Sequence, residues 1–395
     1  MKIQKNKITM KQDSVDNLFS ICGGTTPSTA VSEYWLDGTI PWIGPVDMNK
    51  PGKYISRGRK NITSCAANKI KSKKILKNSI IISTRAPIGY IKINSNDIFT
   101  NQGCHSLHIK GENITDYFYY FFLNNISVLK SISTGTTFQE ISKKNLSSLN
   151  INYPDLKQQK NIAYVLSKQE KQIETIKRLI KNIEKRNQYY SEKLLSGEIK
   201  INDQTSELEF YQSYSNFDNY LTVDQLVSYL PKSKIKTGEA NKENINKFPF
   251  FNCSKEQNLY LDYSICSNEN IFLSTGGSAN VHYYNGEAAY STDVLAITNT
   301  KEVECYYLYN LFNINIKLIE KCFQGSGLKH LNKKDFKKIK LPIPTKDEQK
   351  KISSFLVKKE QELFTLKKIQ QKEEKRFQWM LDNLLSGEYE VIDED

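Results

Sequence analysis

The sequence predicts an α+β protein in which two mixed α/β domains are joined by two long helices that form an antiparallel coiled coil within one chain. Three observations lead to this prediction. The 395 residues repeat at an offset of about 190, each copy ends in a heptad pattern, and a strand-like region precedes each heptad pattern. The predicted architecture therefore has a pseudo-twofold internal repeat.

The repeat is clearest at the end of each copy. The pentapeptide LLSGE occurs at 194–198 and again at 384–388. Without any gap, residues 135–198 and 325–388 are identical at 21 of 64 positions. Solenoid repeats are much shorter, at about 20 to 50 residues. The offset therefore indicates a duplicated pair of domains.

A heptad pattern predicts a helix from about Gln158 to Leu195, which would be about 57 Å long. Its apolar positions alternate spacings of four and three residues, and the same pattern recurs 190 residues later. Gly197 and Gly387 stand where a C-cap glycine ends a helix. The predicted apolar seam consists of Ile162, Leu166, Ile173, Ile176, Ile180, Ile183, Ile352, Leu356, Leu363, Leu366, Phe377 and Leu384.

Matching seams in one chain can bury each other, which favours an intramolecular antiparallel coiled coil. The alternative is two separate helices, each packed on its own domain. Before each helix lies a segment with the pattern of strand, turn and strand. These segments are NSIIISTRAPIGYIKI at 78–93 and ENIFLSTGGSANVHYY at 269–284. The loops between such matching segments diverge, so the sequence predicts one scaffold with two sets of loops.

The charge of the chain is unevenly distributed. The formal net charge is +13, and residues 50–77 contain ten Lys or Arg and no acid. Such a segment attracts polyanions, of which nucleic acid is the usual one, whereas the alternative is a solvated basic surface. Residues 201–325 carry 9 basic and 15 acidic side chains, so the second domain is acidic. Its cations are concentrated early, at Lys232, Lys234, Lys236, Lys242 and Lys247.

Other patterns argue against several classes of protein. The longest apolar run, at 117–123, is far shorter than the roughly 20 residues that span a bilayer, and residues 1–14 contain no apolar signal region. We therefore expect no membrane association and a cytoplasmic location. The seven cysteines are scattered, without a C-x-x-C pair. We find no nucleotide-binding glycine motif, no complete catalytic constellation and no convergent metal ligands in CHSLH at 104–108, because neighbouring strand residues point to opposite faces.

The order of these features resembles the specificity subunit of Type I restriction-modification systems over essentially the whole chain. The similar motifs are IPWIGPVDM at 40–48, STRAPIG at 83–89, TNQG at 100–103, LPIPTKDEQKKI at 341–352 and the two copies of LLSGE. No single motif is very specific to the family, but the order of the motifs, which occurs twice in the chain, is specific.

The resemblance implies a non-catalytic subunit with two target recognition domains, each of which reads one half of a bipartite double-stranded DNA target. It also implies that the coiled coil sets the spacer and binds two methyltransferase (modification) subunits, which restriction subunits then join. S-adenosylmethionine, ATP and Mg would be bound by those partner subunits, and this chain would need no cofactor. Two half-sites on one face of DNA lie about one helical turn, or 34 Å, apart.

On this interpretation, residues 1–154 and 201–344 are the two recognition domains, and residues 155–200 and 345–395 are the two helices. Cations would contact phosphates, whereas polar loop side chains would read base edges. For Arg85, Asn101 and Gln102 a structural role in a turn or strand end is the alternative, and for Ser278, Asn280 and His282 the alternative is a surface loop without base contact. The candidate DNA-binding residues are Lys53, Arg57, Arg59, Lys60, Lys69, Lys71, Lys73, Lys74, Arg85, Asn101, Gln102, Lys232, Lys234, Lys236, Thr275, Ser278, Asn280 and His282.

Two other classes of function compete with this interpretation. One is a self-contained DNA methyltransferase or nuclease, which the missing cofactor motifs oppose. The other is a coiled-coil adaptor that binds proteins and does not read DNA, which the duplicated loop-bearing domains and the cations at 50–77 oppose.

Overall fold

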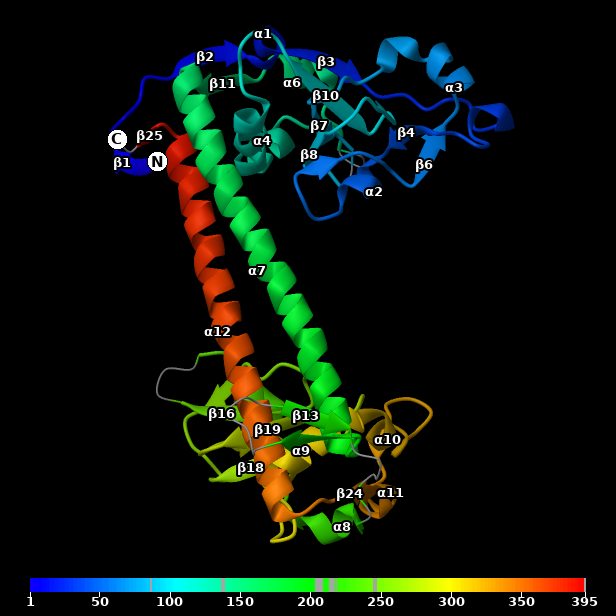
Figure 1. Ribbon diagram of the computed structural model, residues 1–395, viewed down its shortest axis with the longest axis vertical. Helices are drawn as coiled ribbons and strands as arrows, with labels where there is room; N and C mark the ends of the chain where they lie inside the picture. Colours follow the sequence, from blue (N-terminus) through cyan, green and yellow to red (C-terminus); the bar gives the residue numbers. More distant parts are fainter. Residues whose placement is uncertain are drawn as a thin grey trace. The chain divides into compact units, whose positions relative to one another are not determined.

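The protein divides into two compact units, each of which combines a mixed domain with part of both long helices (Figure 1). The computed structural model describes residues 1–85, 87–135, 139–202, 209–212, 217, 219–243 and 247–393. Unit 1 comprises Met1–Arg178 and Lys368–Asp395, and unit 2 comprises Leu179–Lys367.

The two long helices are α7, Leu156–Ser196, and α12, Lys346–Leu385. Both end within the LLSGE motif, and the following glycines adopt positive φ angles of 78° at Gly197 and 81° at Gly387. The left-handed conformation costs glycine nothing, because it has no Cβ atom. The predicted helices and their glycine caps are therefore confirmed.

In both units α7 and α12 pack together in antiparallel orientation. In unit 1, Asn161 donates a hydrogen bond to the carbonyl oxygen of Val391, and Gln169 donates one to Glu373. In unit 2, Asn187 donates to the carbonyl oxygen of Lys359. All the predicted seam residues are buried or half-buried. The structure thus confirms the coiled-coil prediction, although the helices also pack on the mixed domains.

Unit 1 is built around a five-stranded sheet in the order β3-β10-β7-β8-β5, with a smaller sheet in the order β6-β4-β9. All neighbours in the larger sheet are antiparallel except β5 and β8, which are parallel. Two further pairs are β11-β2 and β1-β25. The strands are β1 (Lys2–Lys5), β2 (Lys11–Ser14), β3 (Phe19–Gly23), β4 (Ile40–Ile43), β5 (Tyr54–Ile55), β6 (Lys60–Ile62), β7 (Ile80–Ser83), β8 (Ile91–Asn94), β9 (Phe99–Thr100), β10 (Cys104–Ile109), β11 (Asn150–Tyr153) and β25 (Tyr389–Ile392).

The core of unit 1 lies where the aromatic helix α4 meets the larger sheet and the two long helices. Phe118 packs edge-on against Phe19 of β3, with ring centroids 5.1 Å apart. Leu166 of α7 and Leu384 of α12 belong to the same buried cluster. The shorter helices of the unit are α1 (Val15–Leu18), η1 (Ser32–Tyr34), α2 (Pro45–Met48), α3 (Ser64–Lys69), η2 (Lys71–Lys73), α4 (Thr115–Asn124), α5 (Ile126–Ser131) and α6 (Lys143–Ser147).

Unit 2 repeats this plan with a four-stranded sheet in the order β15-β21-β18-β19 and a smaller sheet in the order β17-β16-β20. Its additional pairs are β14-β24, β12-β13 and β22-β23. The strands are β12 (Ile199–Asn202), β13 (Glu209–Gln212), β14 (Tyr220–Thr222), β15 (Val227–Tyr229), β16 (Phe248–Phe251), β17 (Leu259–Leu261), β18 (Glu269–Ser274), β19 (Val281–Asn285), β20 (Ala289–Tyr290), β21 (Val294–Asn299), β22 (Phe323–Gln324), β23 (His330–Leu331) and β24 (Lys340–Pro342).

The core of unit 2 is equivalent to that of unit 1. Tyr307 and Leu311 of α9 are fully buried beside Phe355 of α12 and Leu194 of α7. The shorter helices are α8 (Val223–Leu226), η3 (Thr237–Glu239), α9 (Cys305–Ile314), α10 (Ile316–Glu320) and α11 (Lys333–Lys338). The predicted pairs of strands are both present: β7 and β8 pair in antiparallel orientation, as do β18 and β19.

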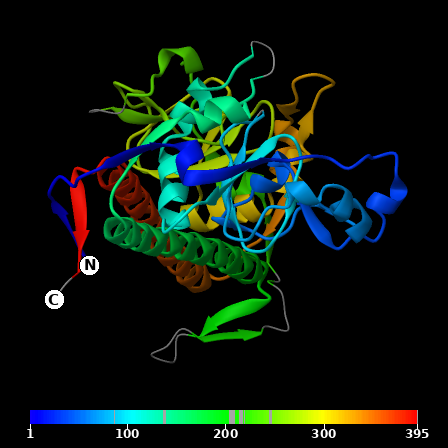
Figure 2. The same cartoon turned by 90° about the horizontal axis from the view of Figure 1, so that it is seen from above.

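The two ends of the described chain meet in unit 1, where β1 pairs with β25 (Figure 2). In unit 2, β12 pairs with β13 in the same antiparallel way. In each unit, therefore, the strand that follows a long helix pairs with the strand that precedes the mixed domain.

The glycine after α12 offers a test of this local geometry. A Cβ atom at Gly387 would lie 3.0 Å from Cγ of Met10, and the φ angle is unfavourable for alanine. We expect Gly387→Ala to lower the free energy of unfolding by about 1–2 kcal/mol. Gly111→Ala, with positive φ but open space, should cost about 1 kcal/mol. Gly238→Ala, with neither constraint, should cost nothing measurable. Urea unfolding of the three variants measures this order, and equal losses in all three would contradict it.

Candidate nucleic-acid interface

The basic segment of unit 1 follows the connection between β4 and β6 and continues through α3 and η2. Arg57, Lys69 and Lys71 are exposed, and Lys73 is half-buried. The hydroxyl of Thr63 caps α3 by accepting a hydrogen bond from the backbone N–H of Ala66. Lys69 therefore lies on a capped helix, Lys71 and Lys73 lie on η2, and Arg57 lies in the connection between β5 and β6.

Acidic residues of the same unit bind two of the exposed cations. Nε of Arg59 lies 3.2 Å from a carboxylate oxygen of the buried Asp47. Nζ of Lys74 lies 2.7 Å from Asp97, and this interaction holds the pKa of Asp97 below its usual value. Both cations remain accessible, but each would exchange an existing partner for a phosphate.

Lys53 lies in the interior of unit 1 and not on its surface. Only 6% of its side chain is exposed. Its ammonium group forms an ion pair with Asp116 and donates to Oγ of Ser167 at 3.0 Å. It also lies 4.6 Å from the centre of the Tyr120 ring. The expectation that Lys53 contacts DNA therefore conflicts with its position, and we leave it out of the proposed interface.

A hollow of about 540 Å³ combines cations with exposed apolar surface beside the basic segment. Arg59, Lys60 and Asn61 line it together with Trp35 and Leu36. Nζ of Lys60 lies 5.6 Å from the Trp35 ring, and Leu36 is 70% exposed. A cation next to an aromatic ring can bind a phosphate and a base face together. Sequence reasoning missed Trp35 and Leu36, because nothing in the sequence distinguishes an exposed apolar residue from a core one.

The three polar candidates near the turn after β7 have structural partners. Nε of Arg85 lies 3.0 Å from Glu140. Oδ1 of Asn101 accepts a hydrogen bond from the N–H of Gly103, and Oε1 of Gln102 accepts one from Thr26. Their contacts agree with the structural alternative for each of them. Ala86 in this turn lies outside the described residues.

In unit 2, Lys232, Lys234 and Lys236 are exposed and alternate with the buried residues Ser233 and Ile235. This alternation places the three ammonium groups on one side of an extended segment. The structure therefore brings together three of the cations that the sequence singled out in this acidic domain.

The turn between β18 and β19 and the start of β19 contain the other candidates of unit 2. Thr275 donates a hydrogen bond to the carbonyl oxygen of Asp293. Nδ2 of Asn280 donates to the carbonyl oxygen of Cys253 at 2.6 Å, and Nε2 of His282 lies 2.8 Å from that of Ser254. Both side chains thus support the connection at 252–258. Ser278 is the exposed member of this set.

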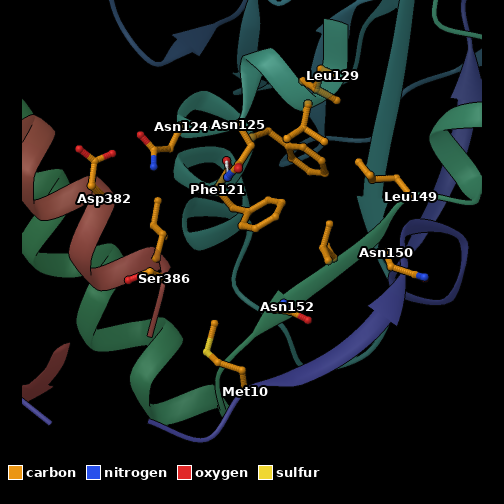
Figure 3. Close-up of a pocket in the computed structure, with 14 residues that line it drawn as sticks. Met10, Phe121, Asn124, Asn125, Leu129, Leu149, Asn150, Asn152, Asp382 and Ser386 are labelled. Carbon is orange, nitrogen blue, oxygen red and sulfur yellow. Dashed lines mark hydrogen bonds between the residues drawn. The ribbon is translucent and has the colours of Figure 1, made fainter. Parts of the chain in front are cut away.

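A cavity of about 330 Å³ lies where the end of α12 meets α4, α5 and β11 in unit 1 (Figure 3). Its polar lining includes the amides of Asn124, Asn150 and Asn152 and the carboxyl group of Asp382. Gln378 donates hydrogen bonds to both Asn124 and Asp382. The described residues that line this cavity include no histidine, cysteine or lysine, but they do include the hydroxyl-bearing Ser386.

Within the described residues, no group of three or more His, Cys, Asp or Glu is placed to hold a metal ion. In the CHSLH segment, Cys104 is buried in a hydrophobic cluster, and Nδ1 of His108 lies 3.0 Å from Oγ of Ser79. Among the helices that the structure describes, none is long and apolar enough to cross a membrane.

Comparison with known proteins identifies the family. The family model for the Type I restriction modification DNA specificity domain matches residues 8–185 and again residues 208–374. The specificity subunit of the type I restriction enzyme MjaIX from Methanocaldococcus jannaschii is 39% identical over 174 residues, which are 43% of this chain and 40% of that protein. The EcoR124I/EcoR124II specificity subunit from Escherichia coli is 31% identical over 156 residues, or 37% of each chain. The chain thus matches about two fifths of the length of these relatives.

Two solved structures have a similar fold. The Type-I restriction-modification system S subunit from M. genitalium aligns with a TM-score of 0.64 and 18% identity, over 99% of this chain and 98% of that one. A chain solved for the structural basis of complex assembly and conformational transition of the type I R-M system aligns with a TM-score of 0.55 and 14% identity, over 95% and 97%. With the family domain matched twice and covering most of its length, this chain belongs to the type I restriction-modification specificity subunit family.

Proposed function

We propose that this chain gives a type I restriction-modification complex its DNA sequence specificity, with each recognition domain reading one half of a bipartite target. The domains are residues 1–154 and 201–344. One observation carries the proposal: the two units share a strand order but differ in the loops that it supports. The connection between β4 and β6 spans residues 44–59, whereas its counterpart between β16 and β17 spans only 252–258.

Phosphate contacts and base contacts fall to different side chains in this proposal. The DNA phosphates are bound in unit 1 by Arg57, Lys69 and Lys71. In unit 2 they are bound by Lys232, Lys234 and Lys236. Such contacts supply affinity without sequence information. Base reading falls to exposed loop residues, which are Ser278 in unit 2 and Leu36 with its neighbours Trp35 and Lys60 in unit 1.

The helices at 155–200 and 345–395 set the spacer and bind two modification subunits in this proposal. A helix of 41 residues such as α7 is about 60 Å long, which suffices to span half-sites about 34 Å apart. Large apolar side chains exposed on the two helices support their role in docking, since exposed apolar surface commonly marks an interface. They are Tyr164, Leu179, Tyr189, Phe364, Ile369 and Trp379.

Specificity subunits of this family are in general not catalytic. We therefore assign methyl transfer with S-adenosylmethionine, and ATP- and Mg-dependent cleavage, to partner subunits. Methyl transfer by the purified chain alone would contradict this assignment and would favour a self-contained methyltransferase.

The division of labour between the domains can be tested by exchange. Replacing residues 1–154 by the recognition domain of another specificity subunit should change one half of the methylated sequence and leave the other half unchanged. Methylome sequencing of cells that carry the chimaera with its modification subunits measures this. A change in both halves, or in neither, would contradict independent reading.

The spacer role of the helices makes a separate prediction. Removing one heptad from both α7 and α12 shortens the pair by about 10 Å and keeps the seam in phase. We expect a shorter spacer between two unaltered half-sites. Removing three residues from each helix is the matched control, because it turns the seam out of phase and should abolish methylation. An unchanged spacer in the heptad variant would exclude the helices as the element that sets the distance.

The exposed cations should determine the salt dependence of DNA binding. Lys69→Ala and Lys71→Ala should each reduce the slope of log K against log salt by up to about 0.9. The reason is that DNA binding releases fewer counterions when one phosphate contact is missing. Lys53→Ala is the matched control. It removes the same charge from a buried pair, so we expect lower thermal stability with an unchanged slope. Fluorescence anisotropy of DNA bound to the assembled complex at several salt concentrations measures these slopes. If the Lys69/Lys71 double variant has the same slope as the unaltered protein, these two lysines do not contact DNA.

A further inference from the structure

The larger sheets of the two units end differently at equivalent edges. In unit 1 the edge strand is β5, which pairs in parallel with β8 and belongs to the long connection at 44–59. In unit 2 the equivalent of β8 is β19, and it is itself the edge of the described sheet. The corresponding connection, 252–258, is less than half as long and contains no described strand. An edge strand of this kind offers unpaired backbone groups to another chain.

The added segment in unit 1 fills the space between the sheet edge and α7. Lys53, which directly precedes β5, reaches Ser167 at 3.0 Å and Tyr120 at 3.4 Å. The Tyr120 hydroxyl donates in turn to Glu170 at 2.7 Å. What remains is a hollow of about 420 Å³, with walls formed by Gly52, Lys53 and Tyr54 and by four positions of α7, which are Ser167, Glu170, Lys171 and Glu174.

Unit 2 has a larger groove at the equivalent place. Its volume is about 710 Å³. The lining includes four positions of α12 that lie 190 residues after those of α7, namely Val357, Glu360, Gln361 and Phe364. The opposite wall comes from β18, β19 and the start of α9, with Glu269, Tyr283, Glu304 and Tyr306. The groove therefore occupies the position that the segment around Lys53 occupies in unit 1.

The groove is acidic, and part of its polar lining lacks partners. It contains three carboxyl groups and the ammonium group of Lys350. Glu304 is paired with Lys346 at 3.3 Å, and Glu269 accepts a hydrogen bond from Tyr283. Glu360, by contrast, forms no ion pair with any described cation, and desolvation of its carboxyl raises its pKa.

A buried hydroxyl group faces the same groove. Tyr306 is 8% exposed, and its hydroxyl lies beside the Glu360 carboxyl; burial, together with this carboxyl, raises the pKa of Tyr306 above its usual value. The buried Oγ of Ser353, about two turns before Glu360 on α12, has no hydrogen-bond partner in the described part of the chain. Leaving a buried polar group without a partner is unfavourable, so a ligand that supplies the partner is favoured.

We propose that this groove binds an extended, lysine-bearing segment of a partner polypeptide, which pairs with β19 and places its ammonium group beside Glu360. The occupant is inferred from unit 1, where the chain itself supplies such a segment. The added strand there is parallel to β8, and the lysine before it forms an ion pair with Asp116 of α4 and donates to Ser167 of α7. Its charge also acts on Glu170, the position of α7 equivalent to Glu360. The proposal goes beyond the proposed function, because it concerns a protein ligand of unit 2 alone and requires no DNA.

One such site is expected per chain. In unit 1 the segment at Lys53 already occupies the equivalent position, so only the unit 2 groove accepts a ligand. A free peptide that carries the sequence of residues 48–57, MNKPGKYISR, is therefore a suitable probe for the full-length protein. It contains the lysine and the strand residues that fill the gap in unit 1.

The experiment measures binding of the fluorescently labelled peptide to the full chain by anisotropy. We expect saturable binding with one peptide per chain. Replacing the peptide lysine that corresponds to Lys53 with glutamate should weaken binding at least tenfold. A scrambled peptide of identical composition should also bind at least tenfold more weakly than the original peptide. No binding up to about 1 mM, or equal binding of the scrambled peptide, would overturn the proposal.

Variants of the protein locate the site. Glu360→Lys should weaken peptide binding at least tenfold. Glu320→Lys is the matched control, because it makes the same change of charge at an exposed position that does not line the groove. Circular dichroism verifies that both variants are folded. Equal weakening by the two variants would show non-specific attraction to the acidic domain and would overturn the proposal.

Crosslinking provides a readout that does not depend on affinity. A photoreactive group next to the peptide lysine should label α12 near Val357 and Gln361, or β19. Labelling confined to other parts of the chain would overturn the proposed site. Because DNA is absent throughout, loss of sequence-specific methylation and loss of peptide binding are separate outcomes, and one can fail without the other.

Discussion

The packing of α7 against α12 completes both hydrophobic cores, and each unit depends on it. Met380 and Leu384 of α12 lie in the same buried cluster as Phe118 and Phe122 of α4. In unit 2, Leu194 of α7 joins the cluster formed around α9 and α12. The mixed domain of unit 1 therefore needs a segment of α12 that is remote in the sequence, whereas that of unit 2 lies between its two helix segments in one continuous stretch, Leu179–Lys367. Since burying an aromatic or aliphatic side chain contributes about 1.5–3 kcal/mol, neither domain keeps its full core without both helices.

The seam between the helices includes polar side chains, and these favour one register. Gln169 donates to Glu373 in unit 1, and Asn187 donates to the carbonyl oxygen of Lys359 in unit 2. Leucine or isoleucine at these positions would bury more apolar surface. A polar pair instead penalises every register that leaves it unsatisfied, as in other coiled coils with polar seam positions. A fixed register matters for an element proposed to set a distance, because a shift by one heptad changes that distance by about 10 Å.

The scaffold could be predicted from the sequence, because its signals are local and occur twice. The heptad spacing, the LLSGE motifs and the pairs β7-β8 and β18-β19 all follow from residues close together in the chain. Side-chain environments depend instead on distant residues. Lys53 and Lys71 look alike in the sequence, but Asp116 and Ser167 hold Lys53 in the interior.

The polar residues near the turn between β18 and β19 also show that side-chain environments cannot be predicted from the local sequence. Asn280 and His282 resemble base-reading side chains in the sequence, yet both contact the backbone of the connection at 252–258. That connection is much shorter than its counterpart at 44–59 in the first copy, so the two cannot be aligned residue by residue. Trp35 and Leu36 line an accessible hollow, although their residue types suggest a core. The exposure of a side chain depends on the loops around it, and the loops are where the two copies diverge.

The connection between β4 and β6 links the buried and the exposed parts of unit 1. Lys53 and β5 anchor this segment against α7 and β8, and Arg57 and Arg59 follow within a few residues. The arginines are thus carried by a segment with little freedom, which reduces the entropy lost when they bind a ligand. In unit 2, the buried Ser233 and Ile235 hold the segment of Lys232, Lys234 and Lys236 in a similar way. Two unrelated loops therefore place cations beside buried anchors, so a change of loop sequence can alter the surface while the scaffold below it remains intact.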